Sequence, residues 1–160
     1  MAEYIGTDSL NQSILISKLD NEIKNNEFEI TVNISDSLKN SDKGIPIKIS
    51  FKNTSNTSYL VRNPSRWVNS NIDVSDSQGR ILPTIKLKVD PKTQCHYQLL
   101  KANDSLVVFY DYSLDKLLGK LDNGNYQISL KYHGLFKTSD EKYDLRFVDL
   151  KSNTKEFFVY

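Results

Sequence analysis

The sequence predicts a single all-β domain, an antiparallel β-sandwich of about eight short strands. Apolar and polar residues alternate with a period of two over most of the chain, the pattern of strands with one buried face. Turn-forming residues separate these runs, as they do in sandwiches. Nine tyrosines belong to an aromatic fraction of 11%, and tyrosine suits a half-buried sheet surface. A length of 160 residues is typical of one domain.

The first 26 residues differ from the rest of the chain. Their apolar residues follow a helical spacing at Leu10, Ile14, Leu15, Leu19 and Ile23. We therefore predict an N-terminal extension or linker over 1–26 and the sandwich over 27–160. Three structures stay open for the extension: a helix on the sandwich edge, a first strand, or a linker from a membrane anchor.

The first half of the sandwich is predicted to hold strands at 28–34, 45–51 and 59–62. Pro46 marks the second of these as beginning there or as lying at a sheet edge. A hairpin follows, in which 72–74 and a return strand from Ile81 to Val89 flank a tight turn. Gly79 in that turn supplies a positive φ at little steric cost.

The second half is predicted to hold strands at 97–100, 106–112, 126–132, 143–148 and 156–160. One short helical element interrupts them at 113–118, with Ser113 as its predicted N-cap. From these candidate runs we predict roughly eight or nine short strands and very little helix.

Composition excludes several classes of function. The net charge of +1 gives no field that attracts a polyanion, so nucleic acid is not a predicted partner. Cys95 is the one cysteine, which rules out an intrachain disulfide and a cysteine-based metal site. The sequence has no run of about 18 apolar residues, so we predict no transmembrane segment.

Catalytic chemistry has no recognisable motif in this sequence. Cys95 and His96 are neighbours in a predicted strand entry, where adjacent side chains point to opposite faces. His96 and His133 are the only histidines and have no metal-ligand spacing around them. Glycine-rich phosphate loops and the Gly-x-Ser-x-Gly nucleophile motif are absent. We predict no enzyme, cofactor or metal; the alternative is an enzyme whose carboxylates converge only in the fold.

One segment combines the residue types that dominate binding surfaces. Arg62-Asn-Pro-Ser-Arg66-Trp67 contains the only tryptophan and two arginines, and Tyr59 stands just before it. Tryptophan and arginine are over-represented at binding hot spots. We therefore predict Tyr59, Arg62, Arg66 and Trp67 as a ligand-binding group. Trp67 has a second interpretation, as a large aromatic that covers the core under a long connection.

The segment Leu121-Asp-Asn-Gly124-Asn-Tyr126-Gln-Ile128 carries a more specific pattern. It resembles the segment before the penultimate strand of many Ig-like domains, in which a tyrosine hydroxyl bonds back to a nearby backbone group. Three further segments resemble parts of such domains and occur in the same order along the chain: 45–53, 72–82 and 100–108. The chain therefore resembles bacterial Ig-like accessory domains, loosely the group around the BsuPI-type proteinase inhibitors. The resemblance implies an Ig-like sandwich with a tyrosine corner at Tyr126.

The function expected from these observations is a non-enzymatic binding or interaction module with a protein partner. The expected location is the periplasm or the cell surface of a bacterium, as a possible lipoprotein whose signal has been removed; a cytoplasmic location is the alternative. A proteinase inhibitor or immunity-type protein that presents an exposed loop is the second function considered. Such folds host many functions, so the fold alone does not choose between them.

Overall fold

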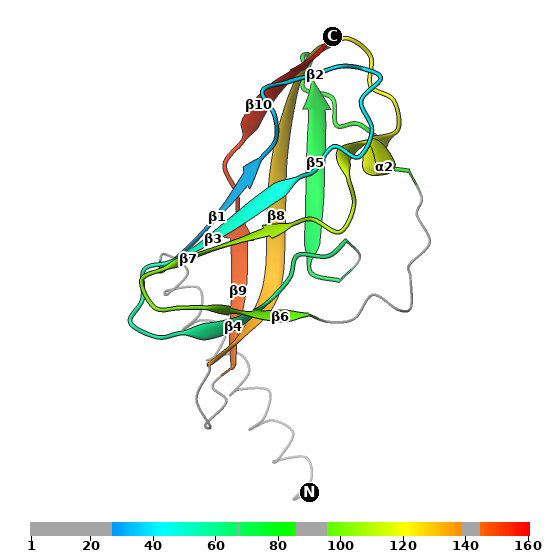
Figure 1. Ribbon diagram of the computed structural model, residues 1–160. Coiled ribbons are helices and arrows are strands. Elements are labelled where there is room, and N and C mark those ends of the chain that lie inside the picture. Colours follow the sequence, from blue (N-terminus) through cyan, green and yellow to red (C-terminus); the bar gives the residue numbers. More distant parts are fainter. Residues whose placement is uncertain (1–26, 67, 86–95, 139–144) are drawn as a thin grey trace, which may run out of the picture.

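A computed structural model describes residues 27–66, 68–85, 96–138 and 145–160, which form an all-β sandwich (Figure 1). The predicted fold class is confirmed. The smaller sheet has the order β1 (Phe28–Asn33), β3 (Lys48–Asn53) and β7 (Ser105–Phe109). The predicted extension at 1–26, the end of the predicted return strand, Cys95 and Trp67 lie outside the described residues.

The larger sheet is built on one long strand, β8 (Gly124–Thr138), which has partners along both of its edges. One edge pairs first with β5 (Ser70–Asp76) and then with β4 (Tyr59–Arg62). The other edge pairs with β10 (Lys155–Val159) and then with β9 (Leu145–Lys151). Each partner therefore covers only part of β8.

Two further strands widen this sheet. β6 (Tyr97–Leu100) pairs with β4, and β2 (Ser37–Leu38) pairs with β10. The pairing of β2 with β10 is parallel, whereas the other described pairings of both sheets are antiparallel. The predicted antiparallel sandwich therefore includes one parallel pair, at this two-residue edge strand.

The described residues form ten strands instead of about eight, and the two-residue β2 is the strand that the sequence did not predict. Along each edge of β8, one connection interrupts the pairing. Residues 63–69 separate β4 from β5, and residues 152–154 separate β9 from β10. At the second interruption the Ser152 N–H donates to the Leu130 carbonyl at 2.8 Å, while Ser152 Oγ accepts from the Leu130 N–H at 2.8 Å. The hydroxyl oxygen of Ser152 thus takes the place of a backbone carbonyl as the acceptor for Leu130. The regular pairing with β8 is interrupted there, as it is at a β-bulge.

The core lies between the two sheets and follows the predicted alternation. Inward-facing residues such as Ile49 of β3 and Ile128 of β8 are fully buried. Five aromatic rings pack with centroids 4.8–6.2 Å apart, mostly edge to face: Phe28, Phe51, Tyr59, Tyr132 and Phe136. Burying each such ring contributes about 1.5–3 kcal/mol, so this cluster is a main source of stability.

The predicted hairpin turn is confirmed, but its return strand is not. Gly79 has φ of 78°, and the Asp76 carboxylate accepts from the N–H groups of Gln78 at 2.9 Å and Arg80 at 3.0 Å. The return pairing stops at a single bridge between Ile81 and Ser75, and 82–85 are not a strand. Pro83 has no N–H to continue a ladder, which explains the early end.

The predicted tyrosine corner is present at the start of β8. The Tyr126 hydroxyl donates to the Asp122 carbonyl at 2.7 Å, and Gly124 has φ of 152°. Two strands follow β8, however, so the corner does not precede the penultimate strand as the resemblance implied. The predicted short helix is also found as α2 (Leu114–Leu118), although the side chain of its N-cap Ser113 makes no capping hydrogen bond.

Candidate functional site

The four residues predicted to bind a ligand do not share one environment. The Tyr59 ring is 1% exposed and belongs to the aromatic cluster of the core. Arg66 is 7% exposed, whereas Arg62 is half-buried at the end of β4. Trp67 lies outside the described residues, so its two interpretations stay open. Of the described three, Arg62 is the one that reaches the outer surface of the sandwich.

Arg66 fastens the 63–69 connection to neighbouring segments. Its guanidinium donates to Thr84 Oγ1, and its backbone N–H donates to Asp111 Oδ1 at 3.3 Å. Ser65 Oγ donates to the other oxygen of the Asp111 carboxylate at 2.8 Å. These contacts hold the loop against the segments at 82–85 and 110–112. They give Arg66 a structural role in the described residues.

Asn69 has a central position in this connection that the sequence analysis did not detect. It is 6% exposed; its Oδ1 accepts from the Ser65 N–H at 2.8 Å, and its Nδ2 donates to the Asn63 carbonyl at 3.1 Å. Its carbonyl accepts from the His133 N–H of β8 at 2.6 Å. One side chain thus closes the loop while its backbone attaches the loop to the sheet.

Beside this loop, the outer face of the larger sheet has a hollow of about 470 Å³. We call it the outer hollow. Arg62, Val68 and Asn69 line one side of it, and Phe147 and Asp149 of β9 line the other. The two sides are strand residues or are tied to strands, so the hollow is preformed.

Apolar side chains extend from the outer hollow across four strands, and we call this set the outer band. It consists of Leu60, Leu99, Leu135, Leu145 and Phe147. The register places Leu60 opposite Leu99 of β6 and Leu135 opposite Phe147 of β9. Leu99, Leu145 and Phe147 are each about 45% exposed. An outward sheet face in water is normally polar, so this band is a departure from the usual alternation.

Basic side chains share this face with the outer band. Arg62, Lys131, Lys137 and Lys151 lie on β4, β8 and β9. Lys137 stands opposite both Leu60 and Leu145, and its Nζ is 4.3 Å from the centre of the Tyr97 ring. The one acidic residue among the described members of this half of the face, Asp149, pairs with His133 at 3.0 Å. Both partners of that pair are well exposed, so it contributes little stability. The face therefore combines exposed apolar side chains with cationic ones.

No three His, Cys, Asp or Glu side chains in the described ranges lie close enough together to hold a metal ion. The same part of the chain includes no helix long and apolar enough to cross a bilayer. Comparison with models of known protein families gives no match, and neither does comparison with curated protein sequences.

Proposed function

We propose that this chain is a non-enzymatic binding module that holds a protein partner on its outer band and outer hollow. The observation that supports the proposal is the set of outward apolar side chains on β6, β4, β8 and β9, of which Leu99, Leu145 and Phe147 are exposed and Leu60 and Leu135 are half-buried. Contiguous apolar surface in a polar surround is typical of protein interfaces. Arg62 and Tyr97 at the edge of the hollow are residue types enriched at binding hot spots.

The charges around the band define the partner's chemistry. A complementary surface has an apolar centre that covers Phe147 and Leu99, and carboxylates that meet Arg62 and Lys137. Because strands carry these side chains, the backbone loses little conformational freedom on binding, which favours affinity. The cationic side chains of this face accelerate association with an acidic partner, and added salt slows it.

Two matched variants test the proposal. Phe147→Asp places a charge in the band, while Phe109→Asp makes the same change at a 61% exposed phenylalanine of β7 on the other sheet. A partner captured by the wild-type chain should then be purified and its affinity measured directly. We expect Phe147→Asp to weaken binding by tenfold or more, about 1.4 kcal/mol, and Phe109→Asp to leave it unchanged. Equal affinity of both variants, or loss only with Phe109→Asp, contradicts the proposal.

The location of the module is part of the proposal and is supported by the resemblance to bacterial Ig-like accessory domains. A protein partner at the cell envelope fits a domain that presents one sheet face. Fractionation of cells that express the full-length native gene, together with labelling by a fatty-acid analogue, tests the periplasmic or surface location and the lipoprotein anchor. Recovery in the cytoplasmic fraction without label contradicts this part.

A further inference from the structure

A second hollow, of about 390 Å³, lies at the other end of the sandwich from the outer hollow, near α2 and β2 (Figure 1). We call it the lysine pocket. Its floor is apolar and is formed by Leu38, Leu114, Leu121 and Val159, three of which are also members of the buried core. The volume falls in the range of roughly 300–1,000 Å³ that is usual for small-molecule sites.

Both carboxylates of the lysine pocket are occupied by backbone donors. Asp42 Oδ2 accepts from the Lys39 N–H at 2.9 Å, and Asp115 Oδ1 accepts from the Ile45 N–H at 3.0 Å. Partial burial raises the pKa of Asp115, but hydrogen bonds from Gly44 and Ile45 lower it further, so this pKa lies below its usual range. The two aspartates thus fix the loop at 39–45 to itself and to α2, which gives the pocket a defined wall.

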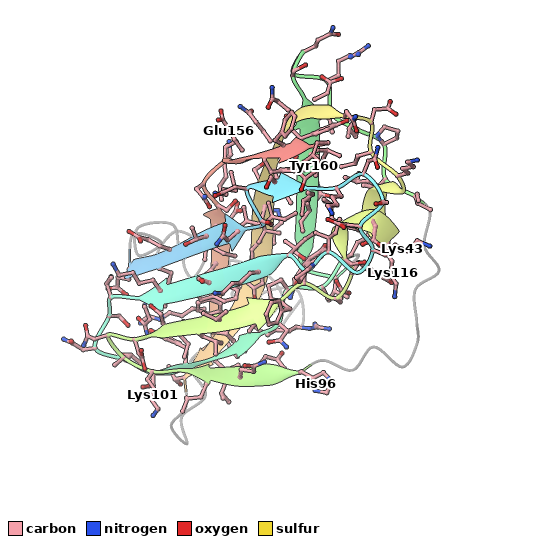
Figure 2. All side chains as sticks on the ribbon, turned by 45° about the horizontal axis from the view of Figure 1, so that its top comes forward. Lys43, His96, Lys101, Lys116, Glu156 and Tyr160 are labelled. Atoms are coloured by element: carbon pink, nitrogen blue, oxygen red, sulfur yellow. The ribbon has the colours of Figure 1, made fainter. Side chains whose placement is uncertain are left out.

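The lysine side chains of the pocket differ from these aspartates, because no described carboxylate pairs with them. Lys39, Lys43 and Lys120 line it, and among the described residues no carboxylate forms an ion pair with their ammonium groups. Lys116 of α2 adds a fourth cation nearby; Figure 2 shows Lys43 and Lys116 on the same side of the molecule. Cations that surround an apolar floor attract an anion whose remaining part is apolar.

We propose that the lysine pocket binds a small organic anion with an apolar tail, such as a medium-chain carboxylate. The tail covers Leu38 and Leu121 on the floor, and the carboxylate meets the ammonium groups of Lys43 and Lys120 at the rim. A compact polar anion gains nothing from the floor, and a neutral alkyl chain gains nothing from the lysines. Tight binding therefore requires both parts in one molecule.

Titration of the ¹⁵N-labelled full chain with decanoate, followed by amide NMR below the micellar concentration, tests the proposal. We expect saturable shifts at Leu38, Gly119 and Leu121. Decanol should bind about tenfold more weakly than decanoate because it lacks the charge, and added salt should weaken decanoate alone. Equal affinity for decanol, or shifts that map to Phe147 and Leu135 instead, overturns the proposal.

Paired substitutions separate the pocket from general surface charge. Lys43→Gln with Lys120→Gln should weaken decanoate binding by about tenfold, whereas Lys131→Gln with Lys151→Gln, an equal change of charge on the outer face, should not. Leu121→Glu puts a carboxylate on the floor and should abolish binding, with an unchanged circular dichroism spectrum as the check on folding. An equal loss from both lysine pairs, or no saturable binding by the wild-type chain, overturns the proposal.

Discussion

Removal of a single hydroxyl from Tyr132 should destabilise the protein more than the same change at Tyr126. The Tyr132 ring is fully buried, and its hydroxyl donates to the Arg62 carbonyl at 2.8 Å, which joins β8 to the end of β4. Burial also raises the pKa of this hydroxyl. Tyr132→Phe leaves the carbonyl without this donor, at a cost of about 1–3 kcal/mol.

The bond at Tyr126 lies closer to solvent. Tyr126 is 8% exposed, and its hydroxyl donates to Asp122, an exposed residue of the preceding turn. Water replaces part of the lost bond in Tyr126→Phe, so its cost should be about 1 kcal/mol or less. The sequence marks Tyr126 through the corner motif, whereas Tyr132 stands at the end of the alternating run 126–132 without a motif of its own.

Urea denaturation of both variants measures this difference, provided that the slope of each transition is unchanged and the midpoint alone reports stability. Phenylalanine keeps both rings, so packing is the same in the two comparisons. A larger loss for Tyr126→Phe than for Tyr132→Phe would refute the argument from burial.

Three further predictions concern the same end of the sheet and its surroundings. Gly134→Ala should cost about 1–3 kcal/mol in chemical denaturation, because its Cβ would lie 2.3 Å from the Tyr132 ring and hydroxyl; an unchanged midpoint would contradict this. Asn69→Ala should lower stability by a similar amount, since the Ser65 N–H and the Asn63 carbonyl lose their partner, and full retention of the melting temperature would show that water replaces them. Burial raises the pKa of Tyr110 to about 12 from about 10 in the unfolded chain, so the stability that it contributes is complete below about pH 10 and is lost as the pH rises towards 12. Tyr110→Phe should flatten that part of the dependence of unfolding free energy on pH, and an unchanged slope would count against the burial of the hydroxyl.

Features set by nearby residues were predicted from the sequence. The period-two strands follow from local alternation, and the Tyr126 bond spans only four residues. The strand that the sequence did not predict is β2, which has only two residues and pairs with β10 near the other end of the chain. The local pattern does not contain that distant partner.

Features set by distant partners were not predicted. Arg66 looks like a surface arginine in the sequence, yet it is buried because Thr84 and Asp111 accept its hydrogen bonds from other segments. Tyr132 owes its buried hydroxyl bond to Arg62, 70 residues away. The sequence contains one indication of the outer band. In Leu145-Arg-Phe147-Val148 apolar residues lie on both faces of β9, which alternation alone does not explain.

The position of β8 has a consequence for the order in which the protein assembles on the ribosome. The strands of the smaller sheet are all synthesised by Phe109, whereas β4 and β5 have to await β8, which ends at Thr138, before they pair with it. Until then the nascent chain carries the apolar inner sides of β4 and β5 without their partner. We therefore expect folding to begin with the pairing of β1, β3 and β7, and arrested chains that end before β8 to be the ones that engage chaperones.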